Sequence, residues 1–133
     1  MFRRKRLPSE LEAPFAAFRA VLDQLEPAKE ALTEVMPTTR MPGRPLAEAL
    51  LEFESGIEGA RPLMPGWRAR EVEPQWTACE HGLDEAAERA RRFREEAPDL
   101  GGFEGLIWAV EELLAPLDVF AVAEERFRAL GAR

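Results

Sequence analysis

The chain holds one cysteine and one histidine among 133 residues, and it has no tyrosine or asparagine. The lone Cys79 excludes an intramolecular disulfide and any metal cluster built from several cysteines. This sparse use of cysteine favours a reducing compartment. The sequence has no run of about 18 apolar residues, and Met1 to Glu10 lack the apolar core of a signal peptide. We therefore predict a cytoplasmic protein without a membrane-spanning segment.

Motifs that mark common enzyme classes are also missing. The sequence contains no Gly-x-Gly-x-x-Gly, no P-loop and no Gly-x-Ser-x-Gly. Di-iron helical bundles use Glu-x-x-His pairs, which do not occur here, and the single His81 cannot supply a three-histidine site. We find no residue set for catalysis, for a cofactor or for a metal, so we predict a non-enzymatic protein.

The region around His81 resembles two families in single features. Histidine-phosphotransfer domains are four-helix bundles of this size with one exposed histidine, but here Asp84 and Glu85 would repel an incoming phosphoryl group. Glu85 and Glu88 form a Glu-x-x-Glu pair similar to that of the helical nucleotide pyrophosphohydrolases. The Glu-x-x-Asp partner motif occurs only at 96–99, where a proline interrupts it. We therefore expect His81 to be a solvated histidine.

Negative charge dominates outside the first few residues. The net charge is −7, yet Arg3, Arg4, Lys5 and Arg6 supply four of the 18 bases. A body this acidic should repel nucleic acid, which leaves only the short basic segment to attract phosphate. Four charges are few for that role, and a solvated terminus is the better explanation of them. We predict a basic disordered arm over residues 1–8 and a single domain over residues 9–133.

The composition also bears on thermal stability. Glutamine occurs only at positions 24 and 75, arginine far outnumbers lysine, and the chain has 11 prolines. Few thermolabile amides and many prolines suit a thermophile, although the arginine bias also fits a GC-rich genome. The thermophile hypothesis requires a melting temperature above about 60 °C.

Apolar residues recur at helical spacing in four segments. The sequence from Ser9 to Glu12 has the form of a capping box, which places the start of the first helix near residue 10. Further helices are expected from Pro45 to Ala60, from Gln75 to Ala97 and from Phe103 to Leu130. Four helices joined by turns, without alternating β-branched runs, predict an all-α antiparallel four-helix bundle.

Prolines and a glycine interrupt these helices. Pro27 should kink or divide the first helix, and Pro116 should kink the last one, where two shorter helices are the alternative. The bundle is therefore expected to have proline-kinked first and last helices. In the third helix, Gly82 either weakens the helix or marks close approach to a neighbour. Cys79 lies on the buried seam of that helix, so we expect no nucleophilic role for it.

The last helix is apolar on two sides. Its first apolar side faces the core, and the second carries Trp108, Ala115, Val119 and Val122. A row of large apolar residues on the surface of a monomer is unfavourable in water. We therefore predict that this second side is an interface, with homodimerisation as the expected form. Packing of the same residues against the first helix of one chain is the alternative.

The connection over residues 62–74 is too apolar for a simple linker. Leu63, Met64 and Trp67 lie among its prolines, and Arg68 and Arg70 follow them. We favour a hydrophobic plug at one end of the bundle over a ligand lid, because such residues need no ligand to explain them. The alternative function is a small-ligand-binding protein or metal-assisted enzyme, with a site under this connection and an anion at Arg68 or Arg70.

Overall fold

The computed structural model describes residues 6–133, and all regular structure in that range is helical. Its α-helices are α1 (Glu12–Thr33), α2 (Leu46–Ala60), α3 (Glu73–Glu96), α4 (Phe103–Leu114) and α5 (Val119–Ala129). Short 3-10 segments extend or connect them: η1 (Ser9–Leu11), η2 (Arg61–Trp67), η3 (Arg70–Val72) and η4 (Ala115–Asp118). No strand occurs within these described residues. The all-helical prediction is confirmed, and the helices fall in the four periodic segments.

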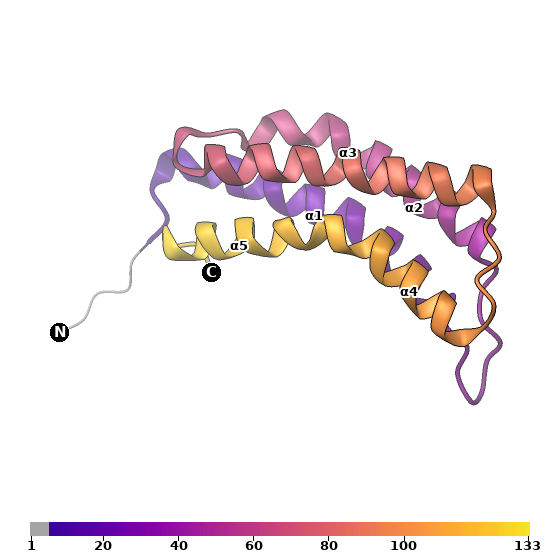
Figure 1. Cartoon of the computed structure of the whole chain (residues 1–133). Helices are drawn as coiled ribbons and strands as arrows, with labels where there is room; N and C mark the ends of the chain where they lie inside the picture. Colours follow the sequence, from indigo (N-terminus) through magenta and orange to yellow (C-terminus); the bar gives the residue numbers. More distant parts are fainter. Residues whose placement is uncertain (1–5) are drawn as a thin grey trace.

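The helices lie side by side along one long direction (Figure 1). α1 packs against α2 and η2, whereas α3 packs against η4 and α5. The connection between α1 and α2 and the one between α3 and α4 lie at the same end of the molecule (Figure 1). The segment η3 and the C-terminus lie at the opposite end. α4 and α5 form one long edge of the molecule in this view (Figure 1).

An aromatic group forms the centre of the core. The ring of Phe18 meets Trp67 edge-on with centroids 4.9 Å apart, and Phe127 lies 5.2 Å from Phe18. Phe18, Trp67 and Phe127 are fully buried. Trp67 belongs to η2, so the apolar connection after α2 packs into the core between α1 and α5. Aromatic pairs at these distances are favourable beyond the area that they bury.

The two prolines predicted to disturb helices lie in different local structures. Pro27 lies inside α1, which continues through it to Thr33. Pro116 lies in η4, so a 3-10 turn joins α4 to α5 in place of one continuous α-helix. α4 and α5 run in different directions on the two sides of this turn (Figure 1). A proline near the start of a helical segment lacks only a donor that would have no partner there.

Two local predictions have different outcomes. The capping-box prediction is wrong, because Ser9 lies inside η1 and no side chain caps the start of η1 or α1. Leu11 is buried, so packing of this side chain fixes the entry into α1.

Gly82 marks a close approach of α3 to a neighbouring segment, which is one of the two alternatives predicted for it. A Cβ atom there would overlap the carbonyl oxygen of Pro116 and lie 2.8 Å from the Cγ2 atom of Val119.

The segment before α1 also contacts the domain. Of the predicted basic arm, Met1 to Lys5 lie outside the described residues. Leu7 packs against the core, and a side chain at Gly131 would overlap the backbone of Arg6. The start of the described chain thus lies beside the turn that follows α5.

Candidate functional site

Acidic and apolar residues alternate along the solvent side of α4, η4 and α5. The acidic positions are Glu104, Glu111, Asp118 and Glu125, and the apolar positions are Trp108, Ala115, Val122 and Ala129. All of these residues are exposed, and we call the set the outer stripe. Alternating steps of four and three residues return to the same side of a helix, because they turn by about 400° and 300°. The buried residues Val110, Leu113, Leu117, Phe120 and Phe127 line the opposite side.

The large apolar residues of the outer stripe are open to solvent. Trp108 is 53% exposed and Val122 is 57% exposed. The indole of Trp108 lies 5.8 Å from the ring of Phe93 on α3. A groove of about 370 Å³ runs between these two helices, and Arg92 and Pro98 also line it. Exposed apolar residues with a polar rim are typical of a surface that another molecule covers.

The four carboxylates of the outer stripe form no ion pair with any residue in the range 6–133. Acids elsewhere on the molecule are often paired. Arg91, for example, binds Glu88 at 2.5 Å and Glu95 at 2.7 Å, and this pairing lowers the pKa of Glu88. The carboxylates of the outer stripe are therefore available to cations from outside the described chain.

Three of the four predicted interface residues lie on the outer stripe. Val119 does not, because it is half-buried and its side chain packs against α3 near Gly82. Its carbonyl oxygen also lies 3.6 Å from the Cys79 sulfur, which donates to it. Apolar spacing alone placed Val119 with Trp108 and Val122. The acidic row escaped the prediction, although its recurrence every seven residues is visible in the sequence.

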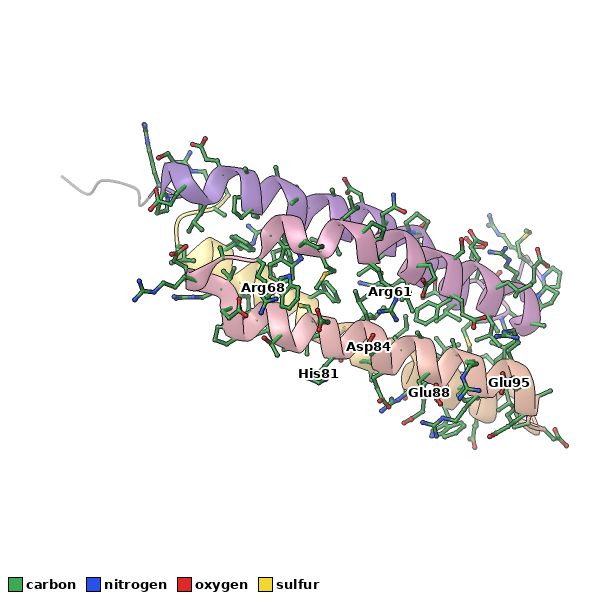
Figure 2. All side chains as sticks on the ribbon, turned by 90° about the horizontal axis from the view of Figure 1, so that it is seen from above. Arg61, Arg68, His81, Asp84, Glu88 and Glu95 are labelled. Carbon is green, nitrogen blue, oxygen red and sulfur yellow. The ribbon has the colours of Figure 1, made fainter. Side chains whose placement is uncertain are left out.

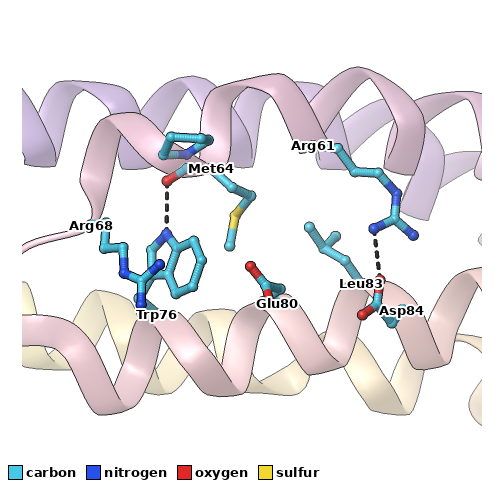
Figure 3. A pocket seen from close by; sticks show the side chains of 8 residues that line it. Arg61, Met64, Arg68, Trp76, Glu80, Leu83 and Asp84 are labelled. Carbon is cyan, nitrogen blue, oxygen red and sulfur yellow. Dashed lines mark hydrogen bonds and ion pairs between the residues drawn. The ribbon is translucent and has the colours of Figure 1, made fainter.

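A second groove, of about 400 Å³, lies between η2 and α3 (Figure 3). Trp76 forms part of its wall and donates from Nε1 to the carbonyl oxygen of Met64 at 2.8 Å. The carboxylate of Glu80 points into the groove between Trp76 and Leu83 (Figure 3). Glu80 forms no ion pair within residues 6–133, so it is the available charged group of this groove.

The arginines of this groove are already engaged. Arg68 binds Glu73 through Nε and Nη2 at 3.1 and 2.7 Å, and its guanidinium lies 4.1 Å from the centre of the Trp76 ring. The bond from Arg68 lowers the pKa of the Glu73 carboxyl. Arg61 binds Asp84 through Nη1 at 2.7 Å (Figure 3). An anion at Arg68 would have to displace Glu73.

The structure separates the other residues predicted for a ligand. Met64 and Trp67 are buried, and Leu63 is half-buried, so none of these three acts as an exposed lid. Arg70 lies at another place, a shallow hollow beside Glu71 and Pro74 at the end of the molecule. Of the five predicted ligand residues, only Met64 and Arg68 therefore share a site, the groove between η2 and α3.

The rate at which the Cys79 thiol reacts tests whether this side chain is buried. Its thiol is fully buried, and burial raises its pKa to about 12. Since the thiolate is the reactive form, we expect a disulfide reagent at pH 8 to modify the native protein at least about a hundredfold more slowly than the unfolded protein. Stopped-flow or manual labelling with and without urea measures this ratio. Equal rates in the two states would place Cys79 at the surface.

His81 is exposed, as predicted, and it lies on the outer edge of α3 with Glu88 and Glu95 (Figure 2). Across residues 6–133, histidine, cysteine and acidic side chains do not gather in threes that could hold a metal ion. Over the same residues, every helix is too short or too polar to cross a membrane.

Comparison of the chain with protein-family models, curated proteins and solved structures gave no match. The class of the protein therefore follows from its own structure. It is an all-helical protein with a buried aromatic core and one exposed side on which acidic and apolar residues alternate.

Proposed function

We propose that this protein acts in the cytoplasm as a non-enzymatic helical bundle that binds another protein chain through the outer stripe. The observation that carries the proposal is the exposed apolar row that contains Trp108 and Val122. Removal of such a row from water favours association by about 25 cal/mol for each Å² of apolar surface. Heptad spacing is also the spacing at which one helix packs along another. The apolar row favours self-association into a homodimer, whereas the carboxylates of the outer stripe oppose it.

Substitution of Val122 by Glu should weaken association by at least about tenfold, because the new charge would have to be buried at the interface. The helical content should not change, since the side chain is already in solvent. Light scattering after size exclusion across a tenfold dilution measures self-association, for which a dimer has a mass near twice 15.0 kDa.

Leu51 supplies the matched control for this experiment. It is 60% exposed on α2, outside the outer stripe, so Leu51→Glu should leave association intact. An equal loss of association in Val122→Glu and Leu51→Glu would contradict a specific interface. A wild-type mass of 15.0 kDa at every concentration would remove the homodimer and leave a different partner as the form of the proposal.

We also infer that the helices form an antiparallel four-helix bundle in which Pro27 and Pro116 bend the first and last helical segments. The ends at which the connections lie support this arrangement (Figure 1). The 3-10 turn at Pro116 supports a bend there, because a proline in a continuous helix would crowd the preceding turn.

We propose further that the protein comes from a thermophile. Arginines form small networks of ion pairs in addition to isolated contacts: Arg44 contacts Glu34, Glu48 and Glu52. Such networks gain importance at high temperature, because the desolvation of charges becomes less unfavourable. A melting temperature above about 60 °C by scanning calorimetry is the expected result, and a lower one would contradict the proposal.

The groove between η2 and α3 favours a second function, the binding of a small cation. Its support is the Glu80 carboxylate, which points into a groove walled by Trp76 and Leu83 (Figure 3). A thermal-shift screen with diamines, polyamines and divalent metals tests it. A ligand at about 100 times its dissociation constant adds about 2.7 kcal/mol to stability. A shift that Glu80→Gln abolishes would support this function, and no shift across the panel would remove it.

A further inference from the structure

We infer that the partner of the outer stripe is an amphipathic helix that carries one row of lysine or arginine and one row of apolar residues, each recurring every seven residues. The inference rests on the proposed function, because it names the class of partner for the same surface. It follows from the sign of the charge, the spacing of the two rows and the shape beside Trp108.

The charge of the outer stripe is of one sign throughout. Its charged members are all carboxylates, and none of them has an ion-pair partner within residues 6–133. The arginines nearest in sequence are engaged elsewhere. Arg126 donates to the carbonyl oxygen of Glu71 at 3.2 Å, and Arg128 pairs with Glu124 at 3.6 Å. A row of cations on the partner would find free carboxylates at every second turn of the helix.

The spacing of the rows fits a helix and defines its length. Glu104 and Ala129 mark the ends of the outer stripe. At about 1.5 Å per residue the path along the helices between them is about 38 Å, and it bends at η4, where α4 and α5 change direction (Figure 1). A partner helix of about three heptads, curved near its middle, would cover most of it. Lysine and arginine suit such a surface, because their aliphatic stems cover apolar atoms while their charged ends reach the acids.

The groove beside Trp108 gives the partner an anchor point. Trp108, Phe93 and Pro98 form the apolar part of a groove of about 370 Å³, which is large enough for a leucine or phenylalanine side chain. Charged side chains form its other walls: Glu85, Arg89, Arg92, Glu96 and Glu112. Tryptophan at the centre of an interface is a frequent site of large binding energy. The apolar row of the partner would enter here, and its basic row would lie over Glu104 and Glu111.

Other occupants fit the charge less well. Two copies that met through the outer stripe would bring eight carboxylates to one interface without an arginine or lysine from either stripe, and each copy carries a net charge of −7. Like charges opposite one another disfavour such pairing. Nucleic acids and anionic membranes are repelled for the same reason.

Two designed peptides and two matched double variants test the inference. The first peptide is a capped helix of about three heptads with one lysine and one leucine per heptad at the complementary four-three spacing. The second has glutamate at each lysine position. Glu111→Lys with Asp118→Lys reverses two charges of the outer stripe, and Glu12→Lys with Asp23→Lys makes the same change of net charge on α1. Calorimetric titration of each full-length protein gives the dissociation constants.

We expect the lysine peptide to bind the wild type and the α1 variant about equally, and to bind the outer-stripe variant at least about tenfold more weakly. The glutamate peptide should bind the outer-stripe variant more tightly than it binds the wild type or the α1 variant. In the wild-type background, Trp108→Ala should weaken binding of the lysine peptide by about tenfold or more, without loss of helicity. This pattern would establish a local charge match together with an apolar anchor.

The remaining outcomes overturn the inference and separate it from the proposed function. Equal binding of the two peptides would mean that charge does not select the partner, and equal losses in the two double variants would mean that only net charge matters. A stable dimer that neither peptide disrupts would make a second copy the occupant, so the proposed association would stand and this inference would fail. A monomer that binds neither peptide would contradict both.

Discussion

Replacement of Trp67 by Ala is expected to lower the free energy of unfolding by about 3–5 kcal/mol, the range for removal of a large aromatic side chain from a packed core. Trp67 is fully buried and lies 4.9 Å from the ring of Phe18 and 6.1 Å from that of Phe127. Its removal would leave a cavity bordered by α1, η2 and α5. Urea denaturation followed by far-ultraviolet circular dichroism measures the change.

Two other substitutions define the scale of this effect. Trp67→Phe keeps a ring in place but loses the contact of Nε1 with the Met64 sulfur at 3.2 Å. It should therefore lower the free energy of unfolding by less than Trp67→Ala does. Trp108→Ala removes a tryptophan that is half in solvent, and it should change stability by less than about 1 kcal/mol. If Trp67→Ala were as mild as Trp108→Ala, the connection after α2 would be a removable cover and not a part of the core.

The positions of the helices were predictable because their signal is local. Apolar residues such as Phe18, Val21 and Leu25 recur at the spacing of a helix face, and the structure buries all three. The third helix gave the same kind of signal, and Cys79 and Leu83 are buried as its seam requires. The favourable pair of Glu85 and Arg89 was also predictable, since ion pairs four residues apart depend only on the helix itself.

Contacts between distant segments were not predictable from spacing. Arg61 on η2 reaches Asp84 on α3, and Arg94 on α3 reaches Glu54 on α2 at 2.9 Å. These partners are far apart in the sequence, and nothing in a single sequence shows which arginine meets which acid. Arg68 and Glu73 are only five residues apart, but Arg68 precedes η3 and Glu73 begins α3, so helix spacing does not relate them. The prediction of an anion at Arg68 therefore lacked the information that Glu73 already binds it.

The outer stripe shows the same division between local pattern and tertiary context. The heptad row of Trp108, Ala115 and Val122 was visible in the sequence as a second apolar side. This side remains in solvent because the other side of α4 and α5 meets α3. Val119 packs against α3 near Gly82 and thereby sets which side faces inward. The acidic row was equally visible, but its meaning depends on the absence of ion-pair partners in the described chain. Only the folded structure provides that observation.

The close contact between α3 and η4 fixes how the last two helices lie on the rest of the molecule. Gly82 is buried, and its Cα faces the carbonyl group of Pro116 and the side chain of Val119. With hydrogen in place of a side chain, α3 approaches η4 more closely than other residues would allow. A change at Gly82 therefore acts on the position of α4 and α5, and through it on the outer stripe.

Gly82→Ala is expected to lower the free energy of unfolding by about 1 kcal/mol, because crowding of the new methyl group outweighs the helix preference of about 1 kcal/mol for alanine over glycine. The new methyl group would overlap backbone at Pro116, which cannot rotate away, and crowding of this kind costs about 1–3 kcal/mol. Gly59→Ala on α2 is the matched control. Its methyl group would meet only the movable end of the Gln24 side chain, 2.6 Å away, so the helix preference should prevail and stability should rise. Urea denaturation of the two variants measures the change in the free energy of unfolding, which should be negative for Gly82→Ala and positive for Gly59→Ala. A stabilising effect at Gly82 would contradict the close approach of α3 and η4.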